Sequence, residues 1–134
     1  MKLTDELRNS LCKQAADAAV DAYAPYSKFK VGSAVLTSSG KVYAGCNVEN
    51  ASYGLTLCAE RVATAVAVSA GQKNLTAIAV ASKDAVSPCG ACRQVLAEFA
   101  TEETEVLIAS LKGVLVERIS LSELLPRQFR FQAS

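Results

Sequence analysis

Two short cysteine motifs constrain the fold more than any other feature, because their side chains must meet at one point to bind a single metal ion. Residues 58–61 read Cys-Ala-Glu-Arg, and residues 88–92 read Pro-Cys-Gly-Ala-Cys. Cys58, Cys89 and Cys92 supply three thiolate ligands for zinc, and Glu60 is a carboxylate that is not needed as a ligand. Zinc with three protein ligands keeps its fourth position open for water, which is typical of a catalytic site.

The absence of histidine narrows the chemistry of this site. With no histidine in the chain, zinc ligands must come from cysteine, aspartate or glutamate, and no histidine can act as a general base. The five cysteines are an odd number, and a cytosolic chain of this size has no need of disulfides. We therefore interpret the cysteines as thiols, three of which bind zinc.

Length and charge limit the class of protein. The chain has 134 residues, so we expect one domain covering residues 1–134. A net charge of +1 does not suggest a surface for binding a nucleic acid polymer. Residues 1–6 lack the apolar stretch of a signal peptide, and no apolar run approaches the ~20 residues of a membrane span. We expect a cytoplasmic protein without a membrane partner.

Hydrophobic patterning and turn residues predict alternating helices and strands. Thr4 caps a first helix that stops before Pro25, and Gly71 ends a second helix. Predicted helices cover residues 4–23, 58–70, 88–100 and 122–125, and predicted strands cover residues 31–36, 42–46, 75–81, 106–110 and 114–119. The two middle helices each connect two strands, which implies crossover connections and a mixed sheet.

The predicted elements place all three thiols at helix N-termini. Cys89 and Cys92 are three residues apart and share one helix face. Pro88 puts both in the first turn, where free N–H groups and the helix dipole stabilise thiolates. Cys58 also stands at a predicted helix start. Glu60 does not share the face of Cys58, so it can lie beside the metal without ligating it.

The charge of such a centre requires a nearby cation. Three thiolates on Zn²⁺ leave a net charge of −1, which makes a bound water less acidic than in a three-histidine site. Arg61 is the nearest cation in sequence. A hydrogen bond from its guanidinium to a ligand sulfur would withdraw charge from the zinc. Arg93 is a second candidate, although on its helix it could equally point outward.

A closed structural zinc site is the alternative interpretation of the same motifs. A closed site needs a fourth ligand. Cys12 and Cys46 are by default buried apolar cysteines, and Cys46, which ends a predicted strand, is the serious competitor for that position. The structural interpretation leaves the Glu60 carboxylate unexplained, so we favour the catalytic one.

Beyond the zinc motifs, the sequence resembles the small homotetrameric cytidine deaminases. The resemblance covers residues 26–32 (Tyr-Ser-Lys-Phe-Lys-Val-Gly), 47–54 (Asn-Val-Glu-Asn-Ala-Ser-Tyr-Gly), 58–61, 87–94 (Ser-Pro-Cys-Gly-Ala-Cys-Arg-Gln) and 123–126 (Glu-Leu-Leu-Pro), in family order. It implies an α/β three-layer sandwich, in which helices flank a five-stranded mixed sheet. It also implies pyrimidine salvage by hydrolysis of cytidine and 2′-deoxycytidine to uridine and 2′-deoxyuridine plus ammonia.

The resemblance assigns the catalytic roles. It implies that Cys58, Cys89 and Cys92 bind zinc and that zinc hydroxide attacks C4 of the pyrimidine. In this assignment Glu60 takes a proton from the zinc-bound water, which leaves the hydroxide, and passes it to the pyrimidine N3 and then to the leaving amine. Because Glu60 is protonated for part of this cycle, we expect burial to raise its pKa.

The resemblance also assigns substrate-binding roles. Asn47 and Glu49 are similar to a pair that hydrogen-bonds the ribose 3′-hydroxyl, Phe29 to a ring that packs on the pyrimidine, and the Ala59 N–H to a group that contacts the substrate near zinc. Taken alone, Phe29 could be a core aromatic and residues 47–50 ordinary loop polarity. In the matching context we favour the functional roles. Residues 26–27 are predicted only as a turn.

Two features predict an assembly. Residues 62–70 of the second helix carry no charge and consist of Ala, Val, Thr and Ser. A helix that is apolar all round is buried on all sides, and one sheet covers only one side, so a second subunit is a candidate for the other. By resemblance, Tyr53 and Phe129 are aromatics that reach into the site of a neighbouring subunit of a homotetramer.

Two alternative functions stay open on the sequence. Blasticidin-S-type nucleoside deaminases share the zinc motif and size but lack the Asn-x-Glu-Asn stretch present at residues 47–50. A non-enzymatic interaction module stapled by zinc is the alternative from a different class. Deaminases of guanine, free cytosine and tRNA adenosine usually have histidine as first ligand, in contrast to Cys58.

Overall fold

One mixed β-sheet runs through the computed structural model of the chain, which describes residues 2–131. Its strands are β1 (Val31–Thr37), β2 (Val42–Cys46), β3 (Leu75–Ser82), β4 (Ala100–Ala109) and β5 (Leu115–Ser120). They lie in the order β2-β1-β3-β4-β5. The β3–β4 pair is parallel and the other three pairs are antiparallel. The five-stranded mixed sheet implied by the sequence is confirmed.

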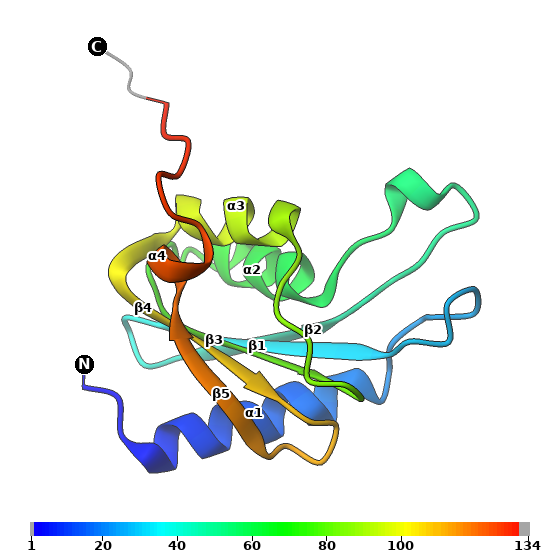
Figure 1. Ribbon diagram of the computed structural model, residues 1–134, viewed down its shortest axis with the longest axis horizontal. Coiled ribbons are helices and arrows are strands. Elements are labelled where there is room, and N and C mark those ends of the chain that lie inside the picture. The colour runs from blue at the N-terminus through cyan, green and yellow to red at the C-terminus, as the bar shows by residue number, and fades with distance from the viewer. Residues whose placement is uncertain (1, 132–134) are drawn as a thin grey trace.

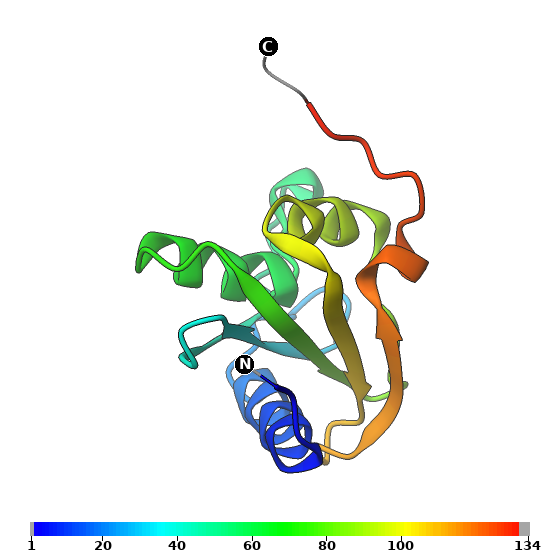
Figure 2. The ribbon, with the colours of Figure 1, turned by 90° about the vertical axis from the view of Figure 1, so that its left-hand side faces the viewer.

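Helices cover both faces of this sheet (Figure 1). The helices are α1 (Asp5–Ala19), α2 (Ala59–Ser69), α3 (Gly90–Glu98) and the short α4 (Leu121–Leu124), with a 3₁₀ turn, η1 (Tyr53–Leu55), before α2. Figure 2 shows α1 on one side of the strands and α2 and α3 on the other. The three-layer α/β sandwich is therefore confirmed. None of the helices in residues 2–131 is long and apolar enough to cross a bilayer.

Each face of the sheet buries its own apolar layer. The layer under α1 includes Leu11, Cys12, Ala15, Leu36 and Leu107, and the layer under α2 and α3 includes Val35, Ile78, Leu96, Val106 and Leu121. Strand β3 separates the two layers by alternation: its alanines at 77, 79 and 81 face α1, and the larger Ile78 and Val80 face the opposite side. The alanines let α1 approach the sheet closely.

The first helix ends earlier than predicted. α1 ends at Ala19 and not near Tyr23. The Tyr23 N–H donates to the Asn47 carbonyl (3.0 Å), and the Tyr23 carbonyl accepts from the Glu49 N–H (2.9 Å). This pairing satisfies the Tyr23 backbone in an extended conformation. It ties the segment before β1 to the segment after β2, and the two segments together form one wall of the functional site.

The fourth strand begins earlier than predicted. β4 starts at Ala100, whereas the apolar run in the sequence starts at Val106. Residues 101–105 are polar, yet Thr104 is buried and its hydroxyl donates to the Leu75 carbonyl (2.8 Å). A register shift between Leu75 and Ala77 of β3 absorbs the extra length. A polar strand of this kind has no signature in an apolar pattern.

Within one chain, the sheet covers only one side of α2, as the sequence predicts, and the covering of its other side by a second subunit stays a prediction. Ala63, Thr64 and Ala67 face the sheet and are buried. Val66 is 43% exposed on the outer face. Together with its neighbours it lines a shallow groove of about 350 Å³.

Candidate functional site

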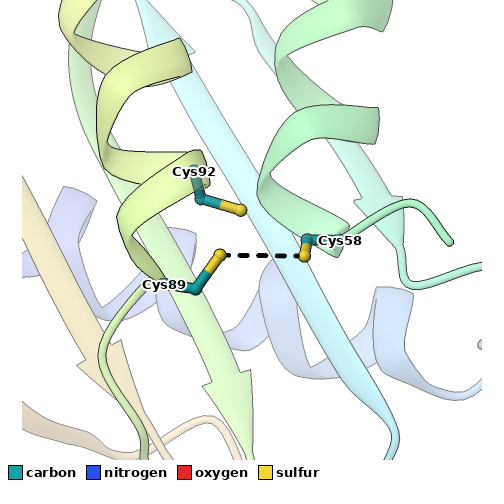
Figure 3. A group of neighbouring side chains, drawn as sticks. All are labelled: Cys58, Cys89 and Cys92. Carbon is teal, nitrogen blue, oxygen red and sulfur yellow. Dashed lines mark hydrogen bonds between the residues drawn. The ribbon is translucent and has the colours of Figure 1, made fainter. Parts of the chain in front are cut away.

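The three motif cysteines converge between two helices (Figure 3). Cys58 is the N-cap of α2, Cys89 is the N-cap of α3, and Cys92 lies in the first turn of α3. Their sulfur atoms all lie within 4.8 Å of one another. The predicted meeting of two helix N-termini is confirmed. The predicted start of α3 was wrong, because the helix begins at Gly90 and Pro88 precedes its cap.

The sulfur spacing fits a zinc ion. Two sulfurs held by one ion at the Zn–S distance of ~2.3 Å and a tetrahedral angle lie about 3.8 Å apart. The Sγ atoms of Cys58 and Cys89 are 4.0 Å apart, so small side-chain adjustments suffice. Free N–H groups at the two helix N-termini favour the negative charge of the thiolates. Cys58, Cys89 and Cys92 can therefore hold zinc, with a fourth position left for water.

The other two cysteines lie outside this group. Within residues 2–131, the cluster of possible metal ligands consists of Cys58, Cys89 and Cys92 alone. Cys12 is fully buried in the layer under α1, and Cys46 is half-buried at the end of β2. The structure thus gives no support to Cys46 as the fourth ligand of a closed site.

Hydrogen bonds shift the pKa values of Cys58 and Cys92 in opposite directions. A hydrogen bond from Cys92, followed by one from Arg61, lowers the pKa of Cys58 to about 5. The same bond to Cys58, together with burial, raises the pKa of Cys92. The Arg61 Nη2 lies 3.6 Å from the Cys58 sulfur and also donates to the Thr56 carbonyl (3.2 Å). The predicted contact between Arg61 and a ligand sulfur is therefore confirmed.

Arg93, the second candidate cation, has other partners. Its guanidinium donates to the carbonyls of Pro88 and Leu124 and to the Ser87 hydroxyl, each at 2.8 Å. These bonds fasten the segment before α3 to the end of α4. Arg93 therefore supports the position of Cys89 through the backbone and not through its charge on a sulfur.

Glu60 lies in the first turn of α2, just after Cys58, and is buried. Only 4% of Glu60 is exposed, and burial raises the pKa of its carboxyl group. Glu60 lies outside the three-sulfur group, as its spacing from Cys58 predicts. A buried carboxyl group with a raised pKa beside a metal centre is suited to accept and donate a proton.

A cavity of about 270 Å³ opens in front of Glu60. Site residues predicted from four separate stretches of sequence line it together: Phe29, Asn47, Glu49, Cys58, Ala59, Glu60 and Cys89. Its size is near the lower end of small-molecule pockets, ~300 Å³. Tyr53 does not line this cavity. It is 74% exposed and lies in an adjoining hollow, where its ring meets the edge of Tyr26 (5.9 Å between centroids).

Asn47 and Glu49, two polar residues that line the cavity, hydrogen-bond to the neighbouring loop of residues 26–31. Asn47 accepts from the Val31 N–H and donates to the Phe29 carbonyl, both at 2.9 Å. Glu49 accepts from the N–H groups of residues 26 and 27 and from the Ser27 hydroxyl. The sequence predicted only a turn here, so it missed Ser27. Its place two residues before Phe29, in the same stretch, was the available signal.

The fold and the cluster define a zinc-binding α/β protein with a catalytic type of metal centre, and comparison with known proteins gives the family. A family model described as "Cytidine and deoxycytidylate deaminase zinc-binding region" matches residues 5–108. The chain is 51% identical over 124 residues to a cytidine deaminase of Halalkalibacterium halodurans, covering 91% of this chain and 93% of the relative. It is 48% identical over 97 residues to a cytidine deaminase of Mycobacterium tuberculosis, covering 71% and 73%. The chain belongs to the cytidine deaminase family, a family of zinc-dependent hydrolases.

Solved structures agree in fold. The crystal structure of a cytidine deaminase from Burkholderia pseudomallei has a TM-score of 0.85 and 45% sequence identity, and the match covers 95% of this chain and 100% of that one. The crystal structure of the enzyme from Mycobacterium tuberculosis has a TM-score of 0.83 and 41% identity, with coverage of 96% and 100%. These comparisons favour neither the blasticidin-S-type deaminase nor the non-enzymatic zinc module.

Proposed function

We propose that this protein hydrolyses cytidine and 2′-deoxycytidine to uridine and 2′-deoxyuridine plus ammonia, as a step of pyrimidine salvage. The observation that carries the proposal is the cavity in which a buried carboxyl group, Glu60, stands beside the three-thiol cluster. A closed structural zinc site would need neither a cavity nor a buried acid.

The chemistry is divided between zinc and Glu60. Zinc held by Cys58, Cys89 and Cys92 supplies a Lewis acid that makes water nucleophilic near neutral pH. Glu60 accepts the proton of the attacking water as its oxygen adds to C4. The same carboxyl group gives that proton to N3. It then takes the proton of the new C4 hydroxyl group and gives it to the amine, which leaves as ammonia as the C4–N bond breaks and the C4 carbonyl forms. The raised pKa of Glu60 suits both directions of transfer.

Substrate binding uses the cavity wall formed by the residues on either side of β1 and β2. Phe29 packs on the pyrimidine ring, and the Ala59 N–H at the start of α2 donates to the base near the metal. Asn47 and Glu49 bind the ribose 3′-hydroxyl. The Asn47 side chain uses one N–H and one oxygen lone pair in hydrogen bonds to the backbone of the loop. Its second N–H and second lone pair remain for a ligand.

Arg61 tunes the charge of the centre. Its guanidinium withdraws electron density from the Cys58 sulfur at 3.6 Å. Arg61 Nε is buried and, among the residues that the structure describes, has no hydrogen-bond partner. A buried N–H without an acceptor destabilises the fold. The burial of the Arg61 Nε–H therefore points to a role of Arg61 beyond packing.

The protein acts as a homotetramer with shared sites. The exposed apolar face of α2, centred on Val66 and the groove beside it, supports this assembly. Tyr53 and Phe129 are 74% and 72% exposed, as is fitting for aromatics that reach into a neighbour. Light scattering coupled to size exclusion should find activity in a species of four chains of 14.1 kDa. Full activity in a single chain would contradict both assembly and shared sites.

We place the protein in the cytoplasm. All five cysteines are free, and such thiols, three of them gathered for metal binding, suit a reducing compartment. Fractionation of cells that produce the full chain should recover it with other cytoplasmic proteins.

The ultraviolet absorbance of cytidine gives a direct test of the reaction. Purified protein should convert cytidine to uridine, and Glu60→Gln should lower turnover by about 10²–10⁴ because the proton carrier is lost. Zinc content should stay unchanged, since Glu60 is not a ligand. Glu98→Gln, at an exposed position of α3, is the matched control and should retain activity. Near-normal turnover by Glu60→Gln would refute the mechanism.

A further inference from the structure

The Ser27 hydroxyl joins two functional side chains that are far apart in the sequence. Its oxygen accepts a hydrogen bond from the Phe29 N–H (3.0 Å) and its proton goes to Oε2 of Glu49. The direction of this relay is fixed, because a backbone N–H only donates and an ionised carboxylate only accepts. One hydroxyl group therefore links the backbone of Phe29, the residue that carries the aromatic ring, to the Glu49 carboxylate, and both residues line the cavity.

The remaining contacts of Glu49 limit what its carboxylate can bind. Oε1 accepts from the N–H groups of Tyr26 (3.0 Å) and Ser27 (3.1 Å), so both of its lone pairs are used. Oε2 accepts the Ser27 hydroxyl and keeps one lone pair. The Ser27 bond, helped by these two N–H groups and by the charge of Lys28, holds the pKa of Glu49 below its usual value. The carboxylate therefore offers one open acceptor position.

The loop that carries Phe29 is held from both sides. Asn47 donates to the Phe29 carbonyl, while Ser27 accepts from the Phe29 N–H. Between Ser27 and Phe29, Lys28 has φ 60°, a left-handed conformation that is uncommon for a residue other than glycine. Such a conformation persists where surrounding bonds fix it. The Ser27 hydroxyl is one of those bonds, and it is exposed, so its role is not to fill the core.

We propose that Ser27 is a positioning residue that sets the orientation of the Glu49 carboxylate relative to Phe29, and so makes the cavity select nucleosides by one sugar hydroxyl. The proposal rests on the proposed function and deepens it. A fixed carboxylate with one open lone pair accepts a single hydroxyl donor. It gains nothing from a sugar that has hydrogen at that position and repels a sugar that has phosphate there.

The alternative is that Ser27 only stabilises the turn. A turn residue affects the whole loop, so its loss would weaken the binding of every ligand of the cavity equally. A positioning residue acts through Glu49, so its loss would weaken only ligands that use the Glu49 carboxylate. The two roles therefore differ in how the effect depends on the sugar hydroxyl.

Steady-state kinetics with cytidine and 3′-deoxycytidine separate these roles. With cytidine, Ser27→Ala should raise KM about tenfold, the size expected for one hydrogen bond to a charged group, and change kcat less than about threefold. With 3′-deoxycytidine, KM should change less than about twofold. Ser27→Thr keeps a hydroxyl and should restore most of the loss. Ser10→Ala, an exposed serine of α1, should match the wild type.

Equal changes of KM on the two substrates, or no change for Ser27→Ala with cytidine, would overturn the proposal. Titration of the Glu49 carboxyl carbon by ¹³C NMR gives a readout that needs no turnover. Ser27→Ala should raise the pKa of Glu49 toward the ordinary glutamate value, with Lys28 present in both proteins. If the wild type fails to deaminate cytidine, the proposed function fails, and the titration still decides whether Ser27 holds Glu49. Identical titration curves would show that it does not.

Discussion

Cys12 and Cys58 each carry a thiol group, on opposite faces of one sheet. Their surroundings shift the pKa values of these two thiols in opposite directions. Cys12 is buried in the apolar layer under α1, where burial raises its pKa to about 11. Cys58 caps α2 on the other face, where hydrogen bonds from Cys92 and then Arg61 lower its pKa to about 5. Position at a helix N-terminus and the neighbouring donors therefore decide which cysteine can bind a metal.

The same contrast holds for the two layers as wholes. The α1 layer consists of apolar side chains. The α2 and α3 layer is apolar at one end, around Leu96 and Ile78, and gives way to Glu60 and Cys92 at the helix N-termini. We infer that the α1 face supplies stability and the opposite face supplies chemistry. Changes on the first should affect unfolding, and changes near the helix N-termini should affect turnover.

The largest stability effect should come from the centre of the α1 layer. Leu107 is fully buried there, and Leu107→Ala should lower the free energy of unfolding by about 2–5 kcal/mol. Denaturant unfolding followed by circular dichroism measures this loss. The folded variant should keep its zinc and turn over cytidine at nearly the wild-type rate. Loss of zinc from the folded variant would break the distinction between the two faces.

A smaller loss of stability should follow from adding a methyl group where α1 packs closely against β1. A Cβ at Gly32 would lie 1.9 Å from the Ala15 carbonyl oxygen, so Gly32→Ala must move the helix away and should cost about 1–3 kcal/mol. At Gly54 a Cβ meets nothing within 4 Å, which makes Gly54→Ala the control for unfolding. Equal thermal midpoints of the two variants would contradict the close packing of α1.

On the chemical face, Arg61→Gln should lower kcat about tenfold, the equivalent of about 1.4 kcal/mol for one charge-assisted bond. The reason is that the Cys58 sulfur loses its cationic partner at 3.6 Å. Arg118→Gln changes an arginine that is 52% exposed on β5 and should keep full activity. Zinc content and kcat, measured on the same samples, separate charge tuning from loss of metal. An unchanged kcat would remove the tuning role.

The smallest effect concerns an ion pair beside α1. Arg8 donates to both Glu105 oxygens (2.9 and 3.0 Å), which lowers the pKa of that carboxyl group. The pair therefore stabilises the fold fully above the ordinary glutamate pKa, and its contribution is lost as pH falls through the lower pKa of the folded state. Glu105→Gln should cost about 1 kcal/mol at pH 7, because both side chains are only partly exposed.

Unfolding at several pH values tests this sign. The difference between Glu105→Gln and the wild type should shrink below about pH 4. Glu102→Gln, at an exposed position of the same strand, should show little difference at any pH. A difference that grows in acid would contradict the assigned shift.

The metal centre could be predicted from the sequence because its geometry is local. Cys89 and Cys92 are related by one helical turn, and Cys58 stands at the start of another helix. Helix-cap position and spacing therefore carry most of the information. The strands of the sheet could be predicted for the same reason, because apolar alternation and turn residues are also local patterns.

The parts that were mispredicted depend on contacts between distant segments. Tyr23 leaves the helical conformation because its backbone pairs with residues 47–49, and β4 begins in polar sequence because it pairs with β3. Ser27 acts on Glu49 across the same two segments. No local pattern in a single sequence reports such pairings, so only the structure could give them.

Metal analysis of cysteine variants tests the central claim most directly. The account predicts one zinc per chain for the wild type and for Cys46→Ala, and less than about a tenth of that for Cys89→Ala and Cys92→Ala, with lower stability because metal binding and folding are coupled. Full zinc content in Cys89→Ala, or loss of zinc in Cys46→Ala alone, would contradict the assignment of the three thiolate ligands.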